Sequence, residues 1–200
     1  MPNVFITGFE HSGTTLLRRL VSMWPGYEKD VIHEQRKLLT YKTRQEAENN
    51  YNDQYSSIKS GEKIPYYGNS AFILNYIERF HDFWPEGLIF HIVRGPDKEA
   101  QSCLRTFKRP MQSTAQTYAV NVQAVLNWLL DEPNTFTIQY EKLIEKPKDY
   151  IKLIYDKLGS VPDDTVLDKI LNTREPWEYE GKRMCGLRYS DHVGRINHNE

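Results

Sequence analysis

The chain has 200 residues and a formal net charge of −1 at neutral pH, and 39% of its residues are hydrophobic. This length is typical of one domain, so we expect a single domain over residues 1–200. The balanced charge gives no sign of a nucleic-acid partner, and no apolar run reaches the roughly 18 residues of a membrane span.

Cys103 and Cys185 are the two cysteines of the chain. They do not make a disulfide framework, which favours a reduced, cytoplasmic setting. The sequence has neither a close cysteine pair nor the His-x-x-x-His spacing of a metal site, so no metal is expected. The first residues lack the basic and long apolar regions of a secretory leader.

The predicted elements alternate between strands and helices along the chain. Short apolar runs bounded by turn residues predict buried strands over 4–7, 31–32, 88–93 and 135–139. Apolar residues at helical spacing predict helices over 14–21, 72–80, 97–107, 118–129 and 150–158. This alternation predicts an α/β fold of three layers, a P-loop-like domain with a central parallel sheet flanked by helices.

Two segments stand apart from this alternation. Residues 36–60 are polar and have few apolar positions at helical spacing, which predicts an exposed helix or helical lid. Residues 174–200 show no periodicity, which predicts an irregular carboxyl-terminal segment.

The first predicted strand ends in a loop with the spacing of a phosphate cradle. Gly8 and Gly13 have the Gly-x-x-x-x-Gly spacing, and Ser12, Thr14 and Thr15 bring three hydroxyls to the start of the next helix. Such a loop directs backbone N–H groups at an anion, and the helix dipole adds positive potential. Because Thr14 stands where a Walker loop has lysine, the pattern favours a phosphate other than the β- and γ-phosphates of ATP. The plain alternative is a structural turn.

A second anion-binding pattern follows the strand over 88–93. Arg94 lies at the carboxyl end of that strand, the edge where parallel sheets bind ligands, and Ser102 follows in the next helix. A guanidinium and a hydroxyl so placed are able to meet on one phosphate. The alternative is a strand-end ion pair for Arg94 and an exposed Ser102.

Together these patterns resemble the sulfotransferases that use 3′-phosphoadenosine 5′-phosphosulfate (PAPS), most closely the bacterial and tyrosylprotein-type members. The resemblance runs in order through nearly the whole chain, over His11-Ser12-Gly13-Thr14-Thr15, Trp84-Pro85-Glu86-Gly87, Arg94 with Ser102, Ile138-Gln139-Tyr140-Glu141-Lys142-Leu143, Pro147, Leu158-Gly159 and Ser190-Asp191-His192-Val193-Gly194-Arg195.

The resemblance implies how the co-substrate would bind. The loop from His11 to Thr15 would hold the 5′-phosphosulfate, Arg94 and Ser102 the 3′-phosphate, and Arg195 would complete the nucleotide site. The product would be PAP, the 3′,5′-bisphosphate, and no metal is needed because protein donors take its place. The family has Lys or Arg where this chain has His11, which would assist only when protonated or as an N–H donor.

The general base implied by the resemblance is Glu34, with His33 second. The alternative for Glu34 is an ion pair with Arg36 or Lys37. His91, on a predicted core strand, is expected to be a buried structural histidine.

The sequence therefore predicts a sulfotransferase that moves a sulfuryl group from PAPS to a hydroxyl or amine. A nucleoside or small-molecule kinase and a non-catalytic nucleotide-binding homologue are the alternatives. The acceptor stays open among a sugar, a phenol, a lipid head group and a peptide, as does the oligomeric state.

Overall fold

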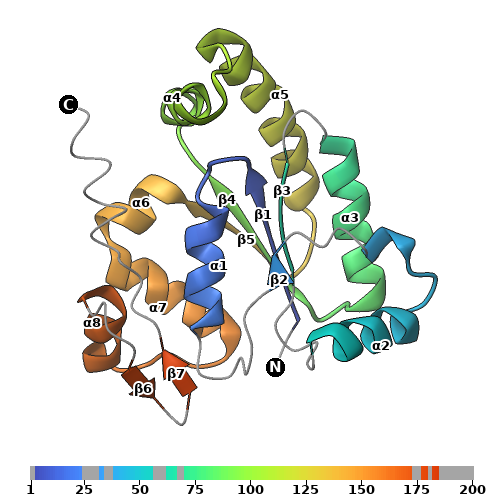
Figure 1. Ribbon diagram of the computed structural model, residues 1–200, viewed down its shortest axis with the longest axis vertical. Helices are drawn as coiled ribbons and strands as arrows, with labels where there is room; N and C mark the ends of the chain where they lie inside the picture. The colour runs from blue at the N-terminus through green and yellow to red at the C-terminus, as the bar shows by residue number, and fades with distance from the viewer. Residues whose placement is uncertain are drawn as a thin grey trace.

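A five-stranded parallel sheet forms the centre of the molecule, with strand order β2-β3-β1-β4-β5 (Figure 1). The computed structural model describes residues 3–23, 32–33, 38–55, 62–66, 70–172, 177–179 and 182–184. The strands are β1 (Val4–Phe9), β2 (Ile32–His33), β3 (Glu62–Tyr66), β4 (Leu88–Val93) and β5 (Thr135–Gln139).

Helices cover both faces of this sheet. They are α1 (Thr14–Ser22), the 3-10 turn η1 (Leu38–Thr40), α2 (Arg44–Tyr55), α3 (Ser70–Phe83), α4 (Pro96–Phe107), α5 (Met111–Leu129), α6 (Tyr140–Glu145), α7 (Pro147–Leu158) and α8 (Asp164–Asn172). The helices α1, α6, α7 and α8 pack on one face, and α3 and α5 pack on the other. The predicted three-layer α/β architecture with a parallel sheet is confirmed.

The core consists of two apolar clusters, one on each face of the sheet. Because successive side chains of a strand point to opposite faces, β1 supplies both: Val4 and Ile6 belong to one cluster, and Phe5 and Phe9 to the other. All six residues of β1 are buried, as expected for a strand covered on both sides. Because β1 is buried between β3 and β4 in a defined register, the carboxyl ends of these three strands lie side by side.

The strand β3 is absent from the sequence prediction, although it is a direct neighbour of β1. Its sequence Glu-Lys-Ile-Pro-Tyr contains a proline and two charged residues, which are unusual in a parallel strand. In the described part of the chain, β2 pairs with residues 62 and 63 of β3, so Pro65 lies beyond this pairing, where a missing N–H is better tolerated. Lys63 is nevertheless buried, with 2% of its surface exposed.

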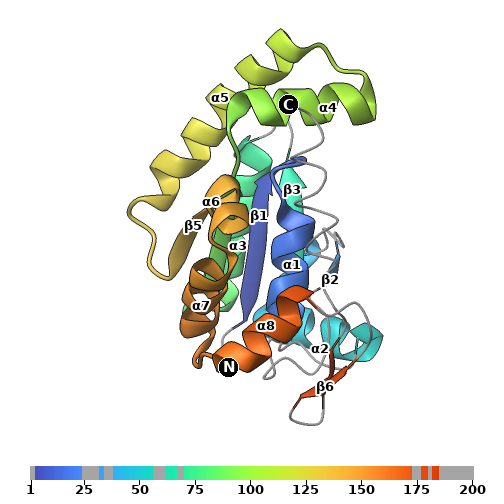
Figure 2. The same ribbon diagram turned by 90° about the vertical axis from the view of Figure 1, so that its left-hand side faces the viewer.

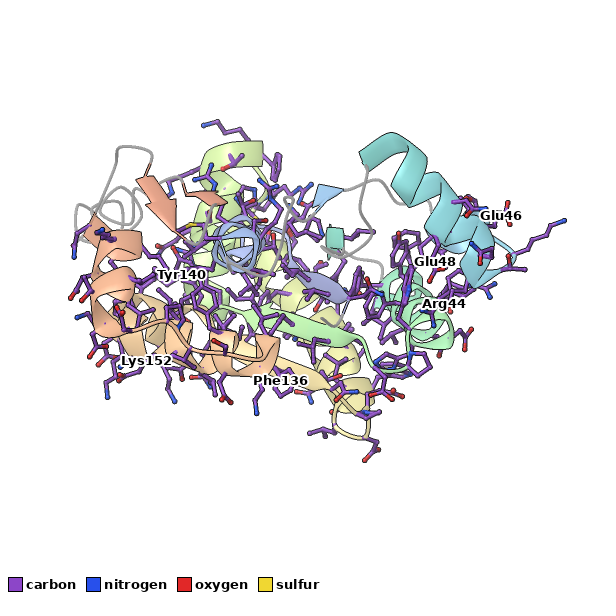
Figure 3. The ribbon with its side chains drawn as sticks, turned by 90° about the horizontal axis from the view of Figure 1, so that it is seen from below. Arg44, Glu46, Glu48, Phe136, Tyr140 and Lys152 are labelled. Carbon is purple, nitrogen blue, oxygen red and sulfur yellow. The ribbon has the colours of Figure 1, made fainter. Side chains whose placement is uncertain are left out.

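Two further segments add structure to what the sequence predicts. Residues 36–60 contain η1 and the polar helix α2, and Ala47 of α2 is buried in the core. In Figure 3, Arg44, Glu46 and Glu48 lie on the opposite side of the molecule from Tyr140 and Lys152. Residues 174–200, predicted to be irregular, contain the antiparallel strands β6 (Trp177–Tyr179) and β7 (Lys182–Met184). The lid role and the single-domain boundary stay predictions.

The neighbouring strands β1 and β4 are followed by connections to opposite faces. The helix α1 follows β1 onto one face, whereas α4 leads from β4 into α5 on the other. Figure 2 shows α4 lying across the end of the sheet toward which β1 points. In open α/β sheets, ligands bind at the carboxyl edge where connections diverge in this way.

Candidate phosphate-binding site

The loop after β1 packs its serine against the strand end. An ideal Cβ on Gly8 would lie 2.5 Å from the Ile92 carbonyl oxygen and 2.5 Å from the Ser12 Oγ, so no larger residue fits there. The Ser12 amide donates to the Phe9 carbonyl at 3.0 Å and closes the turn. Because Gly8 has no side chain, the hydroxyl of Ser12 is able to lie against the backbone at this position.

Gly13 begins the helix that follows. Its φ of 107° lies in the left-handed region, and an added Cβ would lie 2.5 Å from the Tyr140 ring. The first amide that bonds along the helix is that of Leu17, which donates to Gly13 at 3.1 Å, so the amides of residues 14–16 begin the helix without such a partner. The first turn carries no acidic side chain, and an anion would be favoured here.

The three hydroxyls of the loop have different surroundings. Ser12 is fully buried, and its Oγ has no hydrogen-bond partner among the residues that the structure describes. Thr14 is buried and Thr15 is exposed. Ser12 and Thr14 therefore face the interior of the loop, where a buried hydroxyl without a partner is costly unless a ligand or water reaches it.

Arg94 joins the strand end of β4 to the loop after β1. Its Nη1 donates to the His11 carbonyl oxygen at 3.1 Å, and its guanidinium lies 4.6 Å from the centroid of the Tyr140 ring. The buried Nε of Arg94 has no hydrogen-bond partner in the described part of the chain. The predicted loop and the predicted strand-end arginine thus lie in direct contact.

A tyrosine from α5 fixes the backbone of Arg94. The Tyr118 hydroxyl accepts from the Arg94 amide at 3.2 Å and donates to the Arg94 carbonyl oxygen. One residue further on, the Gly95 amide donates to the Glu141 Oε1 at 2.8 Å. Both contacts hold the strand end from outside the sheet, and neither role is predicted by the sequence.

His11 occupies the bend of the loop in a left-handed conformation, with φ of 66°. Its ring meets the Phe107 ring edge-to-face, with centroids 4.9 Å apart. Partial burial lowers its pKa; the carboxylate of Glu10 opposes this shift, and the charges of Arg94 and Arg109 add to it. A lowered pKa favours the neutral form of the His11 ring, which carries one N–H group and no positive charge.

Several solved structures share this arrangement of strands and helices. The chain superimposes on the sulfotransferase domain from the curacin biosynthetic pathway with a TM-score of 0.63 at 17% identity, covering 96% of this chain and 87% of that domain. A sulfotransferase domain from the Synechococcus PCC 7002 olefin synthase gives a TM-score of 0.59 at 20% identity, covering 84% of this chain and 76% of that one. The chain has the sulfotransferase fold.

A mouse sulfotransferase complexed with PAP has the same fold, with a TM-score of 0.57 at 14% identity over 84% of this chain and 62% of that one. No model of a protein family matches the sequence, and no curated protein matches it. The sulfotransferase fold is therefore recognised here through three-dimensional similarity.

The remaining predicted site residues are Ser102, His33, Glu34 and Arg195. Ser102 is half-buried on α4, and its convergence with Arg94 on one phosphate stays a prediction. His33 pairs in register with Lys63 of β3, but its side chain lies outside the described part of the chain, as do Glu34 and Arg195. The assignment of the base therefore stays a prediction.

Two buried titratable residues, one on β4 and one on α4, have shifted pKa values. His91 is fully buried, its Nε2 lies 3.0 Å from the Tyr66 hydroxyl, and burial lowers its pKa to about 3, so the expected structural histidine is confirmed. Glu99 on α4 is also fully buried, and burial raises its pKa to about 8. No local pattern distinguishes this buried carboxyl in the sequence, because Glu99 is one of several charged residues at the start of α4.

Two general features of the described residues bear on cofactors and membranes. They contain no group of three or more His, Cys, Asp or Glu side chains able to hold a metal ion. None of the helices within these residues has the length and apolar character needed to cross a membrane.

Proposed function

We propose that this chain transfers a sulfuryl group from PAPS to a hydroxyl or amine acceptor. The observation that carries the proposal is the hydrogen bond from Arg94 Nη1 to the His11 carbonyl oxygen at 3.1 Å. It joins two anion-binding elements at the carboxyl edge of a sheet whose fold is shared with sulfotransferases. A nucleotide with phosphates at both its 5′ and 3′ positions matches two such elements side by side.

The donors at this edge fit an anionic ligand. They are hydroxyls, helix-start amides and a guanidinium, and the buried Ser12 Oγ and Arg94 Nε have no hydrogen-bond partner in the described residues. An anion that accepts from both atoms would remove the cost of burying them unpaired. The mouse sulfotransferase of the same fold was solved in complex with PAP, which supports the choice of nucleotide.

In the proposed reaction the loop residues hold the phosphosulfate while the acceptor attacks in line. The acceptor oxygen or nitrogen forms a bond to sulfur, the bond from sulfur to the bridging oxygen breaks, and PAP leaves. Ser12, Thr14 and the amides of α1 stabilise the negative charge on the leaving phosphate, and His11 contributes an N–H donor. Arg94 and Ser102 orient the nucleotide through its 3′-phosphate, with Arg195 as a further nucleotide ligand, and Glu34 accepts the acceptor's proton, with His33 as the alternative.

Binding separates this proposal from the kinase alternative. Thermal unfolding is recorded with PAP, AMP or ATP, and we expect PAP to raise the unfolding temperature most. Saturation at a hundred times the dissociation constant corresponds to about 2.7 kcal/mol of added stability. Preferential stabilisation by ATP with Mg²⁺ would contradict the proposed nucleotide.

Turnover separates an enzyme from a nucleotide-binding protein without activity. Transfer from sulfur-labelled PAPS is measured against a panel containing a sugar, a phenol, a lipid head group and a tyrosine peptide. Glu34→Gln should reduce turnover by about 10²–10⁴ and leave PAP affinity nearly unchanged, because only proton transfer is lost. Tight PAP binding without transfer to any of these acceptors would favour the non-catalytic alternative.

A further inference from the structure

The phosphate loop has little positive side-chain charge of its own. Ser12, Thr14 and Thr15 are neutral, and the pKa of His11 is lowered, chiefly by its burial. A phosphosulfate carries several negative charges, and more charge develops on the phosphate as the sulfuryl group leaves. Positive charge at the loop must therefore come from side chains outside it.

A second arginine reaches the loop from the connection between α4 and α5. The Nη1 of Arg109 lies 2.7 Å from the Glu10 Oε2, in the residue that precedes His11. The Arg109 guanidinium also lies 4.4 Å from the centroid of the Phe107 ring, which in turn contacts the ring of His11. The ion pair and the stacked ring hold this guanidinium beside the loop.

The local backbone explains how this connection reaches the loop. Lys108 ends α4 in a left-handed conformation, with φ of 58°, and Pro110 precedes the first residue of α5. The chain therefore reverses within three residues, and Phe107 and Arg109 both face the loop. Arg109 and Glu10 are 30% and 27% exposed, so the ion pair itself adds little to stability.

We propose that Arg109 is a cationic ligand of the anion bound in the loop, which its guanidinium reaches from beside Glu10. The inference rests on the proposed function, and names Arg109 as a contributor to the 5′-phosphosulfate site. A guanidinium has a permanent positive charge and five N–H donors, so one arginine side chain is able to bind a carboxylate and a phosphate or sulfate oxygen together. Arg94 and Arg109 then flank the loop from the two ends of α4.

The binding test compares Arg109→Gln with Arg105→Gln, a matched change of an exposed arginine on α4. Affinities for PAP and for AMP, which lacks the 3′-phosphate, are measured by calorimetry, with circular dichroism as the check on folding. Losing a charge-assisted contact should weaken both nucleotides by about tenfold or more in Arg109→Gln. Arg105→Gln should bind both as the unmodified chain does. Equal affinities in the unmodified chain and Arg109→Gln would overturn the inference.

A rescue variant distinguishes a charge from a packing role. His11→Lys places a cation inside the loop, and in the Arg109→Gln background it should restore most of the lost affinity. Failure of this rescue, with His11→Lys alone binding normally, would assign Arg109 to packing and overturn its role as a ligand.

Pyrophosphate serves as a probe that does not depend on the nucleotide. Arg109-dependent binding of pyrophosphate by a chain that does not bind PAP would sustain the inference and overturn the proposed function. Binding of PAP and pyrophosphate without dependence on Arg109 would overturn the inference alone. A chain that binds neither overturns both.

Discussion

Arg94 and His11 are 83 residues apart in the sequence and are joined by a hydrogen bond from Nη1 to the carbonyl oxygen. The contact bridges the ends of β4 and β1, which are neighbours in the sheet. Because His11 has a left-handed backbone, its carbonyl is held in a conformation that few non-glycine residues adopt. Arg94 thus supports the loop through Nη1, while its Nε has no hydrogen-bond partner among the described residues.

Arg94→Ala is expected to weaken PAP binding by about 2–4 kcal/mol, since a charge-assisted contact is lost and a phosphate is left unpaired. Affinity for AMP should also fall, by a smaller amount, because the loop loses its support at His11. Ser102→Ala should cost about 1 kcal/mol, because a single neutral donor is removed. Calorimetric titration measures both, with Arg79→Ala on α3 as the control. A folded Arg94→Ala protein with unchanged PAP affinity would rule out the 3′-phosphate role.

The two left-handed glycines provide a matched pair of substitutions. Gly159 has φ of 113° and open space around it, so Gly159→Ala should cost only its backbone strain, about 1–2 kcal/mol. Gly13 has φ of 107°, and its new Cβ would meet the Tyr140 ring at 2.5 Å, so Gly13→Ala should destabilise more. Denaturant unfolding measures both changes. Nucleotide affinity should fall in Gly13→Ala alone, and equal effects of the two substitutions would contradict the close packing of the loop.

Tyr118→Phe tests the support of the strand end. The change removes the hydroxyl that bonds the Arg94 amide and carbonyl, and should cost about 1–2 kcal/mol of stability together with a loss of PAP affinity. Tyr155→Phe is the control, because its hydroxyl donates to the Leu20 carbonyl at 2.9 Å in the buried core and not at the loop. Similar losses of stability with a loss of PAP affinity only in Tyr118→Phe are expected. A Tyr118→Phe protein with full PAP affinity would limit Tyr118 to a structural role.

The sequence predicts those parts of the fold whose apolar pattern is local. The strand β4 is a continuous apolar run, and the helix α7 has apolar residues at helical spacing between Pro147 and Gly159. The strand β3 could not be found in this way, because Lys63 and Pro65 interrupt its pattern and only its place beside β1 makes it a strand. The pairing with β1 in the folded chain, and not a local pattern, makes this segment a strand.

Some residues of the candidate site lie in local sequence patterns, and others come to the site only through tertiary contacts. Gly13 and Arg94 lie in patterns whose spacing has a physical meaning, so the sequence predicts both, and the structure places the Arg94 side chain in contact with the loop that contains Gly13. Tyr118 lies in α5 and contacts the backbone of Arg94, and Arg109 lies in the α4–α5 connection and pairs with Glu10. Both residues are far in sequence from the loop after β1. Their residue types and spacing give no local sign of these contacts, so the structure was needed to find them.

The pH dependence of stability tests the buried carboxyl of Glu99. Burial raises the pKa of Glu99 from 4.5 to about 8; the Arg94 charge and a hydrogen bond from Cys103 oppose this shift, whereas Glu10 and Glu141 add to it. Between these pH values the folded chain holds a proton that the unfolded chain has released. The contribution of Glu99 to stability is therefore full below about pH 4.5 and is lost as the pH rises toward about 8.

Glu99→Gln replaces the protonated carboxyl with a neutral amide of similar size and removes this titration. The unfolding temperature of the variant minus that of the unmodified chain should therefore become more positive as the pH rises from about 5 to about 8. Taking the difference cancels the opposite effect of His91, whose lowered pKa costs stability as the pH falls below about 6.5. Glu86→Gln, an exposed carboxyl in the turn before β4, should give a nearly constant difference over the same range. A constant difference for Glu99→Gln as well would mean that Glu99 is ionised in the fold, with the guanidinium of Arg94 stabilising its charge.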